Sequence, residues 1–211
     1  MDLYFSPLAC SMATRIALYE AGLDCNYVRV DTKTKRVADG SDFLAVNPMG
    51  QVPVVRTDDG ERLTENTAIL QYVAGLKPEA GLAPQEGFQR HRLQQWLAFI
   101  TSELHKAVFS PLFSPNSPEG AKAFARQCAE QRFAYLNDAL DGREFLLDRF
   151  TVADAYLTTV LNWANSTGID LGKWPAVQAY FDRLRKWPSV ARAMAEEFAL
   201  YRNGKAPQTA A

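Results

Sequence analysis

Hydrophobic residues in the first 77 positions follow two spacings, which together predict a small mixed α/β unit. Short apolar runs of strand-like composition alternate with segments in which apolar residues recur at helical intervals, such as Ala13, Ile16 and Ala17. Gly22 follows that segment as a suitable helix C-cap, and the turn at residues 58–60 predicts a hairpin between the last two strands. The expected order is a strand at 2–6, a helix at 10–21, a strand at 26–30, a polar loop or poorly formed helix at 31–40, a short helix from 41, strands at 52–56 and 62–63, and a helix through 69–76.

After residue 77 the strand pattern does not return, and the apolar spacing is helical throughout. The proline- and glycine-containing stretch 78–84 is typical of a linker. Helices are expected at 88–109, at 119–140, from 152, from near 175 and, as a last short helix, from 188. We therefore predict an α/β domain at 1–77, a linker at 78–87, an all-helical domain at 88–203 and a loose tail at 204–211. A cleft where the two domains meet is the default position for a binding site.

Composition narrows the class of protein without identifying it. The chain has 211 residues, is 47% hydrophobic and 22% charged, and has a net charge of −1, so no surface field favours nucleic acid or an anionic membrane. The first residues lack the basic segment and long apolar core of a signal peptide, and no window is long enough to span a bilayer. Cys10, Cys25 and Cys128 are too widely spaced to suggest a metal site or a disulfide framework. The cytoplasm, which is reducing, is the expected compartment.

The stretch from Met49 to Val55 is the first candidate for chemistry. Proline inside a central strand would remove a ladder hydrogen bond, so Pro53 is expected at the start of its strand, where an X-Pro bond can be cis. A cis bond would leave the backbone of Val52 free to pair with an extended peptide. Glu65 and Asn66 stand at the start of the next helix, and helix N-termini bind carboxylates. The alternative is an ordinary turn followed by a capped helix.

Cys10 is the second candidate, because it follows the first strand at a helix N-terminus. The helix dipole and free N–H groups at that position favour a thiolate. The next residues are Ser11 and Met12, so a disulfide formed at Cys10 would need a thiol from elsewhere to resolve it. A buried, apolar cysteine is an equally good interpretation, and it is the one we favour for Cys25 and Cys128.

The polar residues of the long helix and the early loop are weaker candidates. If Leu104 is buried, His105 and Ser102 point to a flank of their helix, where an imidazole could donate to a carboxylate or a sulfur. The alternative is a surface or interhelical histidine. Lys35 is an ordinary loop lysine or a partner for a ligand carboxylate, and Asp154 is expected to cap its helix together with Thr151.

Five motifs, in order and at consistent spacing, resemble the glutathione transferases and are most similar to the bacterial beta class. They are residues 6–11 (SPLACS), 47–53 (NPMGQVP), 63–65 (LTE), 103–106 (ELHK) and 150–157 (FTVADAYL). The resemblance covers nearly the whole chain. It implies a thioredoxin-like N-terminal domain with a cis-proline before its third strand, followed by an all-α C-terminal domain.

The resemblance also implies roles for individual residues. Cys10 would face the sulfur of glutathione, Val52 would pair with its cysteinyl unit, and Glu65 would meet its γ-glutamyl ammonium. Asn66 and its helix terminus would hold the neighbouring carboxylate, and Cys10 and His105 would be the catalytic pair. The remaining residues implied near glutathione are Lys35, Gln51, Pro53, Ser102, Glu103 and Lys106, with Ser102 and Glu103 reaching the ligand across a dimer interface. Thr151 and Asp154 would form the folding cap of the family.

Three positions depart from the family pattern. Asn66 stands where serine is usual, Ala98 where relatives can carry an asparagine, and Met49 in place of a common lysine. The helix N–H groups do not depend on the residue at 66, whereas the side-chain hydrogen bond does. These departures bear on the strength of glutathione binding more than on its existence.

The activity implied is conjugation of reduced glutathione, as co-substrate, to a small apolar electrophile, by a homodimer without a prosthetic group or metal. Thiol–disulfide exchange or peroxide reduction through Cys10 is the second route, and a non-catalytic interaction module with the same fold is the alternative. Aromatic residues that could accept the electrophile, or equally could belong to the core, are Phe5, Phe109, Phe113, Tyr156 and Trp163.

Overall fold

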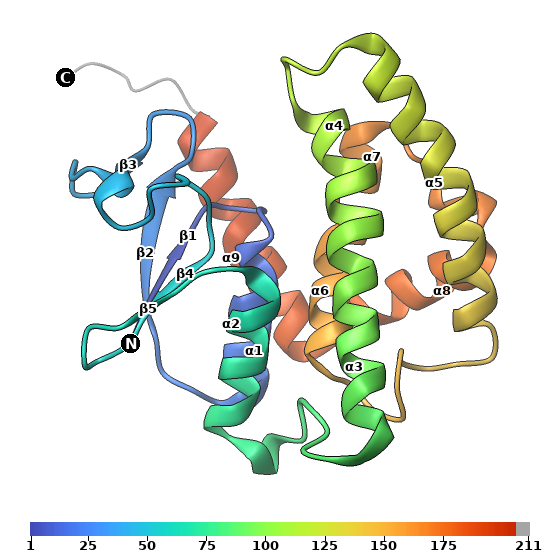
Figure 1. Cartoon of the computed structure of the whole chain (residues 1–211), viewed down its shortest axis with the longest axis horizontal. Helices are drawn as coiled ribbons and strands as arrows, with labels where there is room; N and C mark the ends of the chain where they lie inside the picture. Colours follow the sequence, from blue (N-terminus) through green and yellow to red (C-terminus); the bar gives the residue numbers. More distant parts are fainter. Residues whose placement is uncertain (206–211) are drawn as a thin grey trace.

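The computed structural model describes residues 1–205 and consists of a small sheet domain followed by a helical domain (Figure 1). The sheet has five strands in the order β3-β2-β1-β4-β5. β1 pairs in parallel with β2 and antiparallel with β4, and β3 and β5 join the two edges as antiparallel strands. The elements of this domain are β1 (Asp2–Phe5), α1 (Ser11–Ala21), β2 (Asn26–Asp31), β3 (Arg36–Val37), η1 (Phe43–Ala45), β4 (Val54–Arg56), β5 (Arg62–Leu63) and α2 (Asn66–Leu76).

Two parts of the predicted order differ from the structure, both between β2 and β4. The polar stretch 31–40 contains the short strand β3, because the Asp31 carboxylate accepts from the backbone N–H groups of Lys33 and Thr34 and folds the chain back. The helix expected from residue 41 is a single 3₁₀ turn, η1, whose N-cap Asp42 accepts from Leu44 N. Both corrections concern turns that polar side chains stabilise locally, which a hydrophobic pattern does not report.

The second domain is helical throughout the described residues, as predicted. Its elements, after the short turn η2 (Pro78–Ala80), are α3 (Gly87–Phe99), η3 (Ile100–Phe109), α4 (Ser110–Phe113), α5 (Glu119–Leu140), α6 (Val152–Leu161), α7 (Ala164–Thr167), η4 (Leu171–Lys173), α8 (Pro175–Leu184) and α9 (Pro188–Lys205). The segments α3, η3 and α4 follow one another without a break, and η3 is of the π type. The first long helix therefore continues to Phe113, beyond the predicted end at 109.

Helix α9 is the largest departure from the prediction. A short helix and a loose tail from 204 were expected, but α9 has 18 residues and reaches Lys205. It packs against α1 of the sheet domain, and Val190 and Ala193 on it are fully buried. Figure 1 shows this helix leaving the helical domain and lying beside the first domain. The rest of the predicted tail, residues 206–211, lies outside the described residues.

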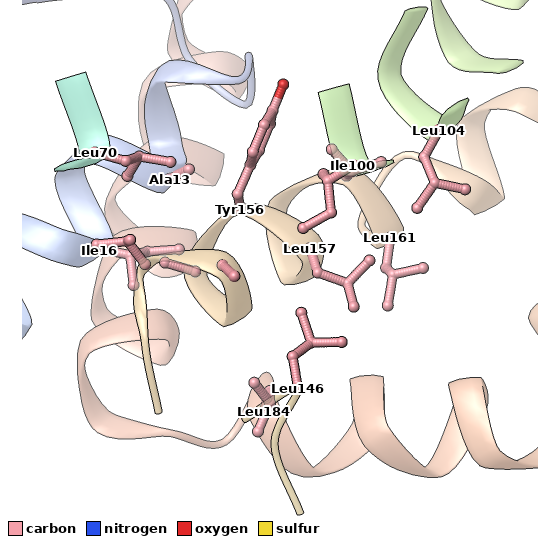
Figure 2. Packing of buried hydrophobic residues seen from close by; sticks show 14 of the residues in the cluster. Ala13, Ile16, Leu70, Ile100, Leu104, Leu146, Tyr156, Leu157, Leu161 and Leu184 are labelled. Atoms are coloured by element: carbon pink, nitrogen blue, oxygen red, sulfur yellow. The ribbon is translucent and has the colours of Figure 1, made fainter. Parts of the chain in front are cut away.

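One hydrophobic core joins the two domains. Figure 2 shows Ala13 and Ile16 of α1 and Leu70 of α2 converging with Ile100 of η3 and Leu157 of α6. Every residue of α6 is buried, so this helix forms the centre of the molecule. The junction between the domains is therefore packed, and a ligand can be bound only at its rim.

The predicted cap at the start of α6 is confirmed. Thr151 and Asp154 form a capping box, and both side chains are buried. Asp154 therefore accepts the N-cap backbone hydrogen bond that glutamate or glutamine accepts in most capping boxes. Among residues 1–205, no helix combines the length and apolarity needed to cross a bilayer.

Candidate functional site

The cis peptide and the first cysteine lie together at the rim of the domain junction. The Val52-Pro53 bond is cis, as predicted, and Cys10 is the N-cap of α1. The Cys10 Sγ donates to the Val52 carbonyl oxygen at 3.2 Å. This carbonyl, which we expected to be free for a peptide, is therefore occupied by the thiol.

Of the two interpretations left open for Cys10, the structure favours a protonated, buried thiol. Burial raises the pKa of the Cys10 thiol to about 11, against the smaller opposing effects of the Lys106 charge and the Ser11 backbone N–H. A thiol with this pKa is protonated at neutral pH. Desolvation, which raises the pKa, outweighs the position at a helix N-terminus, which favours a thiolate.

Asn66 is the most informative residue of the predicted anion site. Glu65, with a φ of +66°, turns the chain into α2 and keeps its side chain exposed. Asn66 is only 7% exposed, and its Oδ1 accepts from Thr14 Oγ1 at 3.1 Å. Its Nδ2 is buried and makes no hydrogen bond. Thr14 therefore fixes the amide so that an unpaired donor remains at the N-terminus of an 11-residue helix, where an anion is favoured.

His105 is half-buried and lies between two aromatic side chains. Its Nδ1 is 2.7 Å from the Tyr156 hydroxyl, and its ring is 4.9 Å from that of Trp163. Burial, with a smaller effect of the Lys106 charge, lowers the pKa of His105 to about 4. The imidazole is therefore neutral near pH 7, and it can act as a hydrogen-bonding group and not as a cation.

Tyr156 was expected as an aromatic that either accepts the electrophile or belongs to the core, and the structure brings its hydroxyl to His105. Burial, together with the neighbouring Cys10 and Glu65, raises the pKa of the Tyr156 phenol. Figure 2 shows its hydroxyl directed out of the apolar cluster that surrounds its ring. In the sequence, an aromatic on a buried helix face within residues 150–157 does not distinguish this tyrosine from a core residue.

Gln51 lies on the segment that leads into the cis peptide, and the Lys35 side chain reaches this segment from the turn before β3. Lys35 has a φ of +58°, and its Nζ donates to the Gly50 carbonyl at 2.9 Å. Gln51 has an exposed side chain, while its carbonyl accepts from Asn47 Nδ2 at 2.8 Å. The Lys35 ammonium therefore lies at a carbonyl two residues before Val52, and Gln51 directly precedes Val52 in the chain.

The residues predicted on the long helix point in different directions. Lys106 is near enough to Cys10 and His105 for its charge to act on both. Ser102 is exposed and lines a groove between α2 and the α3–η3 helix. Glu103 accepts from Ser102 Oγ at 3.1 Å and pairs with Arg132 of α5 at 2.9 Å, so its carboxylate is directed toward α5. Within one chain, Glu103 is therefore not brought to the Cys10 site.

Four of the five candidate aromatics belong to the core, and one is accessible. Phe5, Phe109, Tyr156 and Trp163 are buried. Phe113 is 47% exposed and packs against Phe109 and Trp163, with ring centroids 6.5 and 5.7 Å apart. Because Trp163 Nε1 donates to the Leu8 carbonyl, this aromatic group adjoins the loop that precedes Cys10.

Comparison with known proteins points to one family for both domains. The family profile described as "Glutathione S-transferase, N-terminal domain" matches residues 2–75, and "Glutathione S-transferase, C-terminal domain" matches residues 100–188. The chain is 42% identical over 199 residues to glutathione S-transferase GstA of Escherichia coli O157:H7, covering 93% of this chain and 98% of the relative.

Two solved structures extend this similarity to three dimensions. A sphingomonad glutathione S-transferase in complex with glutathione has a TM-score of 0.89 and 44% identity, over 94% of this chain and 99% of its own. A bacterial beta class glutathione S-transferase of Sphingomonas chungbukensis has a TM-score of 0.89 and 45% identity, over 93% and 98%. These matches confirm the predicted resemblance and the predicted fold class.

Proposed function

The chain belongs to the glutathione S-transferase family, and from this membership we propose that it conjugates reduced glutathione to small apolar electrophiles at the Cys10 site. Members of the family are transferases with glutathione as co-substrate. The observation that carries the proposal is the 3.2 Å contact between Cys10 Sγ and the carbonyl of Val52, the residue before the cis peptide. At this contact the Cys10 sulfur lies beside a backbone edge with which a cysteine-containing peptide can pair.

Glutathione fits the polar groups around that contact. Its cysteinyl unit would pair with the Val52 backbone, and its γ-glutamyl carboxylate would accept from Asn66 Nδ2 and the first N–H groups of α2. The exposed Glu65 carboxylate would receive the γ-glutamyl ammonium. Lys35 and Gln51 beside Val52, and His105 and Lys106 beside Cys10, are the remaining groups we propose at the glycyl end and the sulfur.

The protonation states favour conjugation with Cys10 as a hydrogen-bond donor. Once the glutathione thiol has lost its proton to solvent, its thiolate attacks the electrophilic carbon, and either a leaving group departs or a double bond takes up a proton. If the cysteinyl N–H of glutathione replaces Cys10 Sγ at the Val52 carbonyl, the protonated Cys10 thiol can turn to donate to that thiolate, because its pKa of about 11 keeps the proton on Cys10. Phe113, exposed against Trp163, is the apolar surface we propose for the electrophile.

The test is the Cys10→Ala variant in a conjugation assay with a chlorodinitrobenzene. Losing one hydrogen bond to a thiolate costs about 1.5–3 kcal/mol, so we expect kcat to fall by about 10- to 100-fold and glutathione affinity to remain. Cys25→Ala and Cys128→Ala are the matched controls and should keep wild-type kcat. Complete loss of conjugation in Cys10→Ala, with glutathione still bound by calorimetry, would show that Cys10 is the nucleophile instead.

Thiol–disulfide exchange through Cys10 is the second candidate, because the sulfur lies where a glutathione disulfide would dock. Attack by the Cys10 thiolate would form a mixed disulfide and release one glutathione thiolate, and a second glutathione would resolve it. The mass of the intact protein after incubation with oxidised glutathione separates the routes. A reductant-sensitive adduct that is absent in Cys10→Ala supports exchange, and its absence leaves conjugation.

A homodimer is part of the proposal, because the resemblance to the family brings Ser102 and Glu103 to glutathione across a dimer interface. Ser102 is exposed in the groove between α2 and the α3–η3 helix, and the Glu103 carboxylate pairs with Arg132 of α5. Sedimentation velocity should give twice the chain mass. A non-catalytic module is disfavoured by family membership and by the assembled site, and it would be supported only if the protein neither binds glutathione nor turns over.

A further inference from the structure

The peptide group of Leu8, two residues before Cys10, is held from both sides by the C-terminal half of the chain. Leu8 has a φ of +63°, an unfavourable conformation for a residue with a branched side chain. Its N–H donates to Glu197 Oε2 of α9 at 2.7 Å, and its carbonyl accepts from Trp163 Nε1 at 2.8 Å. Two specific hydrogen bonds therefore maintain a strained peptide in the loop between β1 and α1.

Holding Leu8 N–H with the buried carboxylate of Glu197 costs desolvation free energy. Its side chain is fully buried, and its second carboxylate oxygen lies 3.0 Å from Arg15 Nε. Burial raises the pKa of the Glu197 carboxyl to about 7, although the Arg15 charge opposes the shift. Replacing a buried ion pair with apolar residues is often neutral or stabilising, so stability alone does not account for this pair. The hydrogen bond from Leu8 N–H is a specific structural role for this carboxylate.

Arg15 compensates the buried charge of Glu197. Its guanidinium lies over the rings of Phe5 and Tyr27, at 4.3 and 3.9 Å from their centroids, and is 3.1 Å from Glu196. The arginine is therefore locked in the sheet domain while it contacts α9. Glu196 touches Arg15, Tyr19 and Arg192 but makes no contact with Leu8, which makes it a natural control.

Trp163 connects the same peptide to the other side of the site. Its indole N–H holds the Leu8 carbonyl, and its ring packs against His105. Trp163 therefore contacts both the loop that carries Cys10 and the histidine beside it. A displacement of the Leu8 peptide would move Cys10 Sγ relative to Val52, and errors of about 1 Å in a reacting group can cost about 100-fold in rate.

We propose that Glu197 and Trp163 are positioning residues for the reacting sulfur, because together they fix the Leu8 peptide and through it the place of Cys10 beside Val52. This inference rests on the proposed function, since it assigns the clamp to the sulfur of bound glutathione. Neither residue touches the ligand in this scheme. They act on kcat through the loop, and glutathione affinity, which depends on Val52 and α2, is affected less.

The test compares two double variants that differ only in the acceptor for Leu8 N–H. Arg15→Met with Glu197→Gln keeps an amide oxygen for Leu8, and Arg15→Met with Glu197→Ala removes it. Both lack the ion pair, so neither leaves a buried charge unpaired, and methionine can fill the space between Phe5 and Tyr27. Trp163→Phe removes the donor to the Leu8 carbonyl and keeps the ring, and Glu196→Gln is the control.

Each protein is assayed for conjugation at a temperature at which circular dichroism shows it folded, and glutathione affinity is measured by calorimetry. We expect kcat to fall at least fivefold in the Ala double variant and in Trp163→Phe, with KM for glutathione changed less than twofold. The Gln double variant and Glu196→Gln should stay within twofold of wild type. Equal kcat in the Gln and Ala double variants, or a loss confined to KM, would overturn the inference.

A second readout does not depend on turnover. The rate of Cys10 alkylation by iodoacetamide at pH 9 should change at least threefold in the Ala double variant and not in the Gln double variant. If wild type neither binds glutathione nor conjugates it, the proposed function has failed. If wild type is active and the Ala double variant matches it in kcat and alkylation, only the positioning role has failed.

Discussion

Replacing Asp154 with alanine should be among the most destabilising single changes in the chain. The Asp154 Oδ2 accepts from Thr151 N at 2.8 Å and from Thr151 Oγ1 at 2.9 Å. Its Oδ1 accepts from Leu146 N at 2.9 Å and from Tyr180 Oη at 2.8 Å. The carboxylate is fully buried, and its four hydrogen bonds join the α6 cap to α8 and to the segment before α6.

The expected magnitude follows from the donors that alanine would leave without a partner. A buried donor that loses its acceptor costs about 1–3 kcal/mol, so at the lower figure the four donors together cost about 4 kcal/mol. A folded protein of this kind has about 5–15 kcal/mol in total. For a chain of this length, about 2–4 °C of Tm is lost per kcal/mol, which gives a decrease of about 8–16 °C.

Equilibrium unfolding in urea, at one protein concentration for all variants, measures this loss. Thr151→Ala is the matched control, because it removes only the capping-box hydroxyl and should cost about 1–2 kcal/mol. Circular dichroism and tryptophan fluorescence should give the same midpoint. A loss for Asp154→Ala no larger than that for Thr151→Ala would refute the reasoning, since it would mean that the Leu146 and Tyr180 bonds contribute nothing.

Three further predictions concern the site. Burial lowers the pKa of His105 from 6.5 to about 4, so its imidazole should remain neutral between pH 5 and 8. The stability that the neutral imidazole confers above pH 6.5 should be lost as the pH falls towards 4, by at most about 3 kcal/mol. An imidazole NMR signal that titrates near 6.5 would contradict this. Alkylation of Cys10, followed by peptide mapping, should accelerate about tenfold per pH unit from 7 to 10, and a plateau near pH 7 would indicate a thiolate. Thr14→Val, which frees the Asn66 amide to turn, should weaken glutathione binding about threefold to tenfold by calorimetry; an unchanged Kd would remove the orienting role of Thr14.

Much of the fold could be predicted from short-range patterns in the sequence. The turn residues at 58–60 specified the β4–β5 hairpin, and the spacing of Leu93, Leu97 and Ile100 specified the inner face of the long helix. The capping box at Thr151 was predictable for the same reason, whereas at Pro53 the residues only allowed a cis bond and the family resemblance implied it. The family resemblance then supplied the arrangement of the two domains, which local patterns do not contain.

What only the tertiary structure decided depends on residues distant in sequence. Desolvation of Cys10 by its surroundings reverses the effect of the helix dipole on its pKa, and no window around Cys10 contains that burial. The length of α9 follows from its packing on α1, and the Leu8 peptide is held by Glu197 from 189 residues away. The sequence by itself determined the local elements and the kinds of chemical group at the site, whereas protonation state and the placement of the reacting sulfur required the packed protein, because both are set by neighbours that only folding brings together.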